Sequence, residues 1–198
     1  MKSYIADFIS LLFPELCTAC GESLIATEQL MCTDCRYSLP FTNFHLQADN
    51  IVARQFWGKI NVEAAYALYY FTKGGKVQNL MHHFKYKGMY RIGNLLGIIA
   101  GTQLAENDQF KTIDYIIPVP LHKTRLKQRG YNQSKCFADG LAKKLTGVVN
   151  DNTLVRIRAT ETQTHRSRFL RFENMQEVFK VTNTQKLENK HVLLLMIL

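Results

Sequence analysis

The sequence predicts an α/β fold, in which a parallel-sheet domain follows a small metal-binding segment at the N-terminus. Two CxxC pairs lie within residues 17–35. An apolar, β-branched run at residues 113–117 leads into a basic segment and a helical pattern, and a second apolar run occupies residues 191–198. With 198 residues, 46% of them hydrophobic, the chain has room for one ordinary domain and a small appendage. We therefore expect two parts, residues 1–45 and residues 46–198.

The four cysteines of the N-terminal segment have the spacing of a metal site. Cys17 and Cys20 form one CxxC pair, and Cys32 and Cys35 form a second pair after eleven intervening residues. Two such pairs supply the four thiolates that zinc prefers in structural sites, and a complete thiolate shell leaves no open position for chemistry. We expect a structural zinc ion. Two disulfides and a redox-active CxxC are the alternatives, and both are disfavoured by an expected cytoplasmic setting and the lack of a surrounding βαβ pattern.

Residues 4–12 carry apolar side chains at nearly helical spacing, and Pro14 ends the run. This pattern predicts a short docking helix. The run is too short to span a bilayer, and it lacks the charged region and the small-residue cleavage site of a secretory signal. We therefore expect no membrane insertion and a cytoplasmic location.

The middle of the chain shows alternating strand and helix patterns. Residues 64–71 (AAYALYYF) predict a strand, and residues 77–105 predict two helices separated at Gly88. Lys85 and Lys87 lie at the exit of the first helix, where cations also suit the helix dipole. The run at residues 113–117 predicts a buried strand that ends at Pro118, because proline has no N–H to donate.

A dense group of cations follows this strand. The expected loop carries Lys123, Arg125, Lys127 and Arg129, and residues 130–133 (GYNQ) precede the next helical pattern. Residues 121–172 hold twelve Lys and Arg residues against three Asp and Glu residues, so this window accounts for the formal charge of +9. A localised positive field at the carboxyl end of a strand indicates a polyanionic ligand, either a phosphate compound or nucleic acid. A solvated basic loop is the alternative.

Residues 154–181 form a polar, arginine-rich stretch. Long polar loops in compact domains often serve as active-site lids, so we expect a flap here, with a solvated surface as the alternative. The apolar run that follows, residues 191–198, predicts a final strand.

Several motifs, taken in order, resemble the ComF/GntX family of phosphoribosyltransferase-like proteins, known from bacterial competence and DNA uptake. They are the CxxC pairs with Gly21, FKYKG at residues 84–88, PVP at 118–120 with RGYNQ at 129–133, and the arginine-rich segment at 156–179. The resemblance spans nearly the whole chain. It implies a Cys₄ zinc-binding segment and a type I phosphoribosyltransferase-like parallel-sheet domain with a flap.

The resemblance also implies a site for phosphoribosyl diphosphate (PRPP) or another phosphorylated ligand. The positions expected on its diphosphate side are Lys85, Lys87, Arg125, Arg129, Gly130, Asn132 and Gln133. The positions expected in the flap are Thr162, Gln163, Arg171 and Asn174. Fixed cations and backbone N–H groups suit a magnesium-bound diphosphate leaving group, because catalysis there is mostly positioning and electrostatics.

The chain departs from the family's pattern after the final strand. The family continues with Asp-Asp, two variable residues and Thr-Thr-Gly, which hold the ribose hydroxyls and the 5′-phosphate. Here Met196, Ile197 and Leu198 follow the apolar run. We therefore expect a domain that is incomplete at the C-terminus, truncated by a frameshift or a sequencing error, poorly soluble and inactive as a transferase. Magnesium is expected with PRPP only in a full-length parent.

Three functional interpretations follow. The chain is a phosphoribosyltransferase relative, a basic module that binds single-stranded DNA or a DNA-uptake helicase without catalysis, or a non-functional fragment. Salt dependence separates the first two, since binding to a nucleic-acid backbone weakens steeply as salt rises. Phe169 and Phe172 are the aromatic residues near the basic flap, which is fewer than a base-stacking platform would need.

Overall fold

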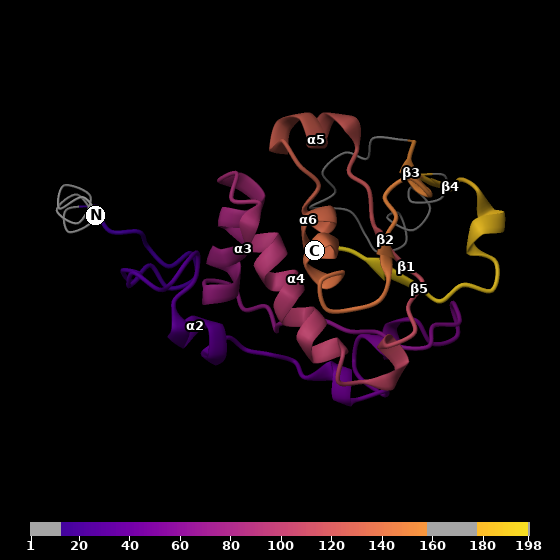
Figure 1. Cartoon of the computed structure of the whole chain (residues 1–198), viewed down its shortest axis with the longest axis horizontal. Helices are drawn as coiled ribbons and strands as arrows, with labels where there is room; N and C mark the ends of the chain where they lie inside the picture. The colour runs from indigo at the N-terminus through magenta and orange to yellow at the C-terminus, as the bar shows by residue number, and fades with distance from the viewer. Residues whose placement is uncertain (1–12, 158–177, 198) are drawn as a thin grey trace. The chain divides into compact units, whose positions relative to one another are not determined.

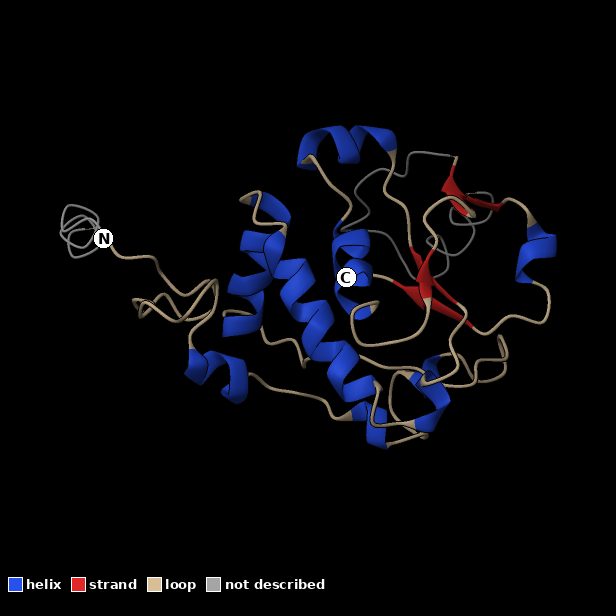
Figure 2. Cartoon of the chain, viewed as in Figure 1, coloured by secondary structure: helices blue, strands red, loops and turns tan. Residues whose placement is uncertain are grey.

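The computed structural model of this chain describes residues 13–157 and 178–197. Its residues divide into two compact units, which meet in the sequence between Ile92 and Gly93. Figure 1 labels the elements along the chain, and Figure 2 shows that helices and irregular chain outweigh the short strands. The predicted division at residue 45 stays a prediction.

The first unit is built from short helices joined by irregular chain. Its elements are α2 (Thr33–Ser38), the 3-10 helices η1 (Phe44–Leu46) and η2 (Ala53–Gln55), and α3 (Lys76–Tyr86). Val77, Leu80 and Phe84 of α3 are buried. They recur at intervals of three and four residues, which places them on one face of the helix. This face belongs to the core of the unit, together with Met31 and Leu39.

The strand predicted for residues 64–71 is wrong. These residues, all of them described, make one isolated bridge, in which Tyr69 pairs with Phe41. The rings of the two residues pack with their centroids 4.9 Å apart, and Thr42 N donates to Leu68 O at 3.2 Å. The aromatic residues of this segment pack on a half-buried surface. Strand propensity favours the same residue types for the same reason, so the composition predicted a strand that does not form.

The second unit contains a parallel sheet. α4 (Arg91–Leu104) begins at the end of the first unit and continues into the second. The remaining elements are η3 (Asp108–Phe110), β1 (Tyr115–Pro118), α5 (Lys123–Arg129), α6 (Gln133–Leu141), β2 (Val148–Val149), β3 (Leu154–Arg156), β4 (Phe179–Val181), η4 (Thr184–Leu187) and β5 (Val192–Leu195). The strand order is β2-β1-β5 with both pairings parallel, and β3 and β4 form a separate antiparallel pair. The predicted α/β class with a parallel sheet is confirmed.

β1 is the central strand of this sheet. Tyr115 pairs with residues of both neighbouring strands, and Pro118 pairs with Leu195 at the end of β5. Ile116 and Ile117 are buried. A central strand covered on both faces has a continuous apolar sequence, which is the pattern that predicted β1. The two helices separated at Gly88 and the final strand are confirmed as α3, α4 and β5.

The basic segment after β1 was predicted as a loop, but its residues Lys123–Arg129 form the helix α5. His122 caps this helix, its Nδ1 accepting a hydrogen bond from Thr124 N at 3.3 Å. Gly130 ends it in the left-handed conformation, with φ of 79°. α5 has no buried residue, so it lacks the apolar stripe by which helices are recognised in sequences. Its lysines and arginines are nevertheless good helix formers.

Some predicted features lie outside the described residues. They are the docking helix at residues 4–12 and the flap positions Thr162, Gln163, Arg171 and Asn174. The strands β3 and β4 flank the flap segment in the sequence and pair with each other. Within the described part of the chain, no helix is both long enough and apolar enough to cross a bilayer.

Asp114 ties the start of β1 to the start of β5. Its carboxylate accepts hydrogen bonds from His191 N at 2.9 Å and from Lys190 Nζ at 3.0 Å. The His191 N–H, followed by Lys190, lowers the pKa of Asp114 below its ordinary value of 3.8. A lowered folded-state pKa means that the ionised carboxylate stabilises the fold above the unfolded-state pKa, and that this contribution is lost as pH falls through the folded-state pKa.

We predict that Asp114→Asn lowers the melting temperature at pH 7 and that its difference from the wild type shrinks below about pH 4. Thermal unfolding followed by circular dichroism between about pH 3 and pH 7 measures this. A difference that is the same at every pH would show that the charge of Asp114 does not stabilise the fold.

Candidate functional site

The four predicted cysteines come together in the first unit. Their sulfur atoms all lie within 4.8 Å of one another, so they could hold a metal ion. Zinc–sulfur bonds of about 2.3 Å in a tetrahedron place neighbouring sulfurs roughly 3.8 Å apart. The Sγ atoms of Cys20 and Cys32 are 3.7 Å apart, and all four cysteines are free thiols. The donor set and its spacing therefore fit a tetrahedral thiolate centre.

The chain around the cysteines forms two linked turns. Gly21 has φ of 84° and donates its N–H to Cys17 O at 2.9 Å, which closes the first turn. Cys32 is the N-cap of α2, so the second pair sits at the start of a helix. Thr18 joins the two turns, since both its N–H and its hydroxyl donate to Leu30 O, at 2.9 and 2.7 Å. These contacts bring the two pairs together.

Backbone N–H groups point at two of the sulfurs. Cys32 N donates to Cys17 Sγ at 3.3 Å, and Cys35 N donates to Cys32 Sγ at 3.4 Å. Burial raises the pKa of Cys17, but N–H donors, those of Cys20 and Cys32 first, outweigh it and bring the pKa to about 6. Burial and the neighbouring thiols raise the pKa of Cys35. Four thiolates this close need a cation, which is the role that a metal ion has in such sites.

Lys85 and Lys87, two of the predicted diphosphate contacts, lie at the C-terminal end of α3 in the first unit. Lys85 is half-buried in the last turn, and Lys87 is exposed and caps the helix through its N–H, which donates to His83 O at 3.1 Å. The other described predicted contacts belong to the second unit.

Those contacts gather beyond the carboxyl end of β1. Arg125 and Arg129 lie on α5, Gly130 ends that helix, and Asn132 and Gln133 begin α6. Arg129 NH1 donates to Gln133 Oε1 at 3.1 Å. We call this set the β1 corner. It combines two guanidinium groups with the N-terminus of a nine-residue helix, whose dipole favours an anion.

Gln133 is buried at the β1 corner although its side chain is polar. It is 1% exposed, and its Nε2 has no hydrogen-bond partner among the described residues. A buried donor left unpaired costs roughly 1–3 kcal/mol, and such exceptions often mark sites where a ligand or water completes the bonding. Gln133 Nε2 is therefore a buried donor that is left unpaired at the β1 corner.

Asn132 holds the β1 corner together. Its Oδ1 accepts a hydrogen bond from Ser134 N at 3.0 Å, and its Nδ2 donates to Val119 O at 3.2 Å. Ser134 Oγ in turn accepts from Ile197 N at 3.3 Å. The start of α6 is thus fixed to the chain that leaves both β1 and β5. Asn132 was predicted as a ligand contact, and this stays a prediction; its described hydrogen bonds position the corner.

Arg156 of β3 adds a further cation near the corner. Its guanidinium lies over the ring of Phe179, 5.4 Å from the centroid. Burial, followed by the charge of Arg125, lowers the pKa of Arg156. The sequence analysis assigned Arg156 only to the edge of the flap segment. The alternation of apolar and basic residues at positions 154–158 (LVRIR) was the signal that could have predicted a strand with Arg156 on one face.

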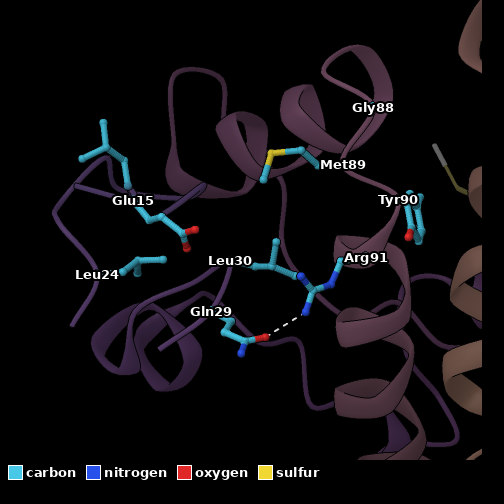
Figure 3. A pocket seen from close by; sticks show the side chains of 9 residues that line it. Glu15, Leu24, Gln29, Leu30, Gly88, Met89, Tyr90 and Arg91 are labelled. Carbon is cyan, nitrogen blue, oxygen red and sulfur yellow. Dashed lines mark hydrogen bonds between the residues drawn. The ribbon is translucent and has the colours of Figure 1, made fainter. Parts of the chain in front are cut away.

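A separate pocket lies in the first unit, with a volume of about 520 Å³. Figure 3 shows that Arg91 donates to Gln29 Oε1 there, at 2.8 Å. The pocket is lined by Glu15, Leu16, Leu24, Gln29, Leu30, Gly88, Met89, Tyr90 and Arg91. None of the predicted metal or ligand contacts in the described part of the chain is among these residues.

Comparisons with known proteins relate most of the chain to one group of bacterial proteins. No family model and no solved structure matches it. The DNA utilization protein YhgH of Shigella flexneri is 26% identical over 170 residues, which cover 84% of this chain and 70% of that protein. YhgH of Escherichia coli K12 is 25% identical over the same shares. YhgH of Salmonella typhi is 40% identical over 68 residues, 34% of this chain and 30% of that protein. The chain is homologous to the DNA utilization protein YhgH.

Proposed function

We propose that this chain is a phosphoribosyltransferase-like protein of the ComF/GntX kind, which binds PRPP or another phosphorylated ligand and takes part in DNA utilization. The observation that carries the proposal is at the β1 corner. There Arg129 is paired with the buried Gln133, whose Nε2 is unpaired among the described residues. The homology to YhgH supports the link to DNA utilization, which extends in this proposal to uptake and competence.

The chemistry of the corner suits a diphosphate. Arginine offers a planar set of N–H donors that matches phosphate oxygens, and charge-assisted hydrogen bonds of this kind are about twice as strong as neutral ones. Arg125 and Arg129 supply such groups, and Gln133 and the start of α6 add neutral donors. The motif resemblance adds the flap positions Thr162, Gln163, Arg171 and Asn174 to the proposed site, and Lys85 and Lys87 of the first unit stay predicted phosphate contacts.

The proposal covers binding and not transfer. β5 is followed by Met196, Ile197 and Leu198, and none of these side chains is a carboxylate. Carboxylates after this strand are what would hold the ribose hydroxyls and a magnesium ion in the family's pattern. In a family member that carries them, magnesium would accompany PRPP and neutralise the developing charge on the diphosphate.

Zinc is the metal that we propose for the four cysteines, in a structural role. Thiolate ligands select soft or borderline metals, and a complete Cys₄ shell leaves no position for a substrate. The thiols also require a reducing compartment to stay free of disulfides, so a cytoplasmic location belongs to the same proposal.

We predict that Arg129→Gln weakens PRPP binding roughly tenfold to hundredfold, because it removes a charge-assisted hydrogen bond worth about 1.5–3 kcal/mol. Isothermal titration with PRPP and Mg²⁺ at fixed salt measures the change. Lys127→Gln is the matched control, since this exposed residue of α5 loses the same charge outside the β1 corner. Equal losses in the two variants would indicate a diffuse basic surface and would contradict a defined site.

A second candidate function is binding of single-stranded DNA or a DNA-uptake helicase without catalysis. The concentration of positive charge in residues 121–172 and the homology to YhgH favour it. For a single strand, the logarithm of affinity falls with the logarithm of salt at a slope of about −0.7 per neutralised phosphate. We would favour this function over the first if the affinity of the chain for a labelled oligonucleotide fell steeply with rising salt and the chain showed no binding of PRPP.

A further inference from the structure

Leu30 has a backbone conformation that is uncommon for its residue type. Its φ is 66°, which lies in the left-handed region. Among the described residues other than glycine, the others with positive φ are all asparagines, namely Asn43, Asn183 and Asn189. Asparagine adopts this region readily, whereas the side chain of a leucine crowds its own backbone there. The conformation of Leu30 therefore has to be held by its surroundings.

Thr18 makes the contacts that hold Leu30. Its N–H, at 2.9 Å, and its hydroxyl, at 2.7 Å, both donate to Leu30 O. Thr18 is 3% exposed, so water competes little for its hydroxyl. A hydroxyl has one proton to donate, and that of Thr18 is directed at this carbonyl. The two bonds fix the direction of the Leu30 carbonyl, and with it the backbone conformation of the residue.

This contact joins the two pairs of cysteines. Thr18 directly follows Cys17, and Leu30 lies two residues before Cys32. The two cysteines themselves approach each other, since Cys32 N donates to Cys17 Sγ at 3.3 Å. An ion bound by both pairs has to unite two separate turns, and contacts that already unite them reduce the conformational entropy that binding costs. The contact between Thr18 and Leu30 is therefore placed to act on metal affinity.

We propose that Thr18 is a positioning residue of the metal centre, whose hydroxyl holds the two cysteine pairs together through the left-handed Leu30. This inference rests on the proposed metal-binding role of the four cysteines. The hydroxyl donates to a carbonyl oxygen, so it acts on the thiolates through the backbone. Contacts outside the ligand shell orient the ligands of metal sites and tune their affinity in this way.

Thr18→Val tests the proposal, because it keeps the shape of the side chain and the N–H but removes the hydroxyl. Competition between the full-length chain and a chelator of known affinity should show zinc affinity lowered about threefold to tenfold, which corresponds to one hydrogen bond. Thr18→Ser keeps the hydroxyl and should bind zinc more tightly than Thr18→Val. Thr27→Val is the control, because Thr27 is an exposed threonine between the same two cysteine pairs, and it should match the wild type.

A substitution at Leu30 separates the proposed role from a general loss of packing. Leu30→Asn introduces a residue that adopts the left-handed conformation readily. Combined with Thr18→Val, it should recover part of the lost zinc affinity, because the turn then needs less support. Alone, Leu30→Asn should bind zinc at least as tightly as the wild type, and this test does not depend on the folding of Thr18→Val.

The possible results are distinguishable. Wild-type zinc affinity in Thr18→Val would overturn the role of Thr18 while leaving the metal site in place. Thr18→Ser that binds as weakly as Thr18→Val would also overturn it, since the hydroxyl would then contribute nothing. Leu30→Asn that weakens binding alone, or recovers none of it in the double variant, would contradict the action through Leu30. A wild-type chain that binds neither Zn²⁺ nor Co²⁺ would instead overturn the proposed metal site.

Discussion

Replacing Cys35 with serine is expected to abolish metal binding and to unfold the first unit. Cys35 is fully buried, and its carbonyl oxygen accepts a hydrogen bond from the N–H of the buried Leu39 at 3.3 Å. Structural zinc contributes about 10–16 kcal/mol in small zinc-binding peptides, which is comparable to the net stability of about 5–15 kcal/mol of a typical domain. Loss of a ligand that releases the metal ion therefore removes a free energy comparable to the whole net stability of a typical domain.

Metal analysis of the purified variant and far-UV circular dichroism measure both effects. Cys136→Ser is the control, because Cys136 lies on α6 in the second unit and is not one of the four clustered cysteines. This variant should keep the wild-type metal content. A Cys35→Ser protein with a full complement of zinc and a wild-type melting curve would show that the cysteines do not form a structural centre.

Gly97→Ala is expected to destabilise the second unit by at least about 3 kcal/mol. α4 and α6 meet backbone to backbone at this point, where a Cβ on Gly97 would overlap the carbonyl oxygen of Phe137 and lie 2.8 Å from Gly140 Cα. Backbone atoms cannot turn aside as a flexible side chain can, so the helices must move apart. Because α6 begins with Gln133, the β1 corner should be displaced as well, and PRPP affinity should fall with stability.

Urea unfolding followed by circular dichroism measures the change. Thr102→Ala is a suitable control, since Thr102 lies on the exposed side of α4 and its hydroxyl donates to Ile98 O of the same helix at 3.0 Å. A Gly97→Ala chain that unfolds at the wild-type urea concentration would show that the two helices do not approach this closely.

The sequence predicted best where local chemistry determines the outcome. Two CxxC pairs have few uses other than metal binding, and their four sulfurs do come together. The apolar run of β1 and the paired helices around Gly88 were predictable for a similar reason, because a buried face requires a regular apolar pattern. α5 was missed because it buries none of its residues, and residues 64–71 were assigned to a strand because aromatic packing has the same composition as a strand.

The details of the β1 corner could not be predicted, because they depend on contacts between elements. Nothing in the sequence distinguishes Gln133, which is buried with an unpaired Nε2, from an exposed glutamine. Arg156 is likewise brought near Arg125 only by the fold, through a strand that follows 31 positions later in the chain. The role of Asn132 in positioning α6 also depends on the fold, because its side chain donates to the carbonyl of Val119, the residue after β1.

The most direct test of the proposed function is an NMR titration of the isotope-labelled chain with PRPP and Mg²⁺. If the ligand binds at the β1 corner, the side-chain amide of Gln133, the backbone amide of Gly130 and the guanidinium of Arg129 should shift together and saturate at one equivalent. The backbone amides of the four-cysteine segment should not move. If the signals of residues 129–133 stay unchanged at saturating ligand, or if only signals elsewhere move, the β1 corner is not a phosphate-binding site.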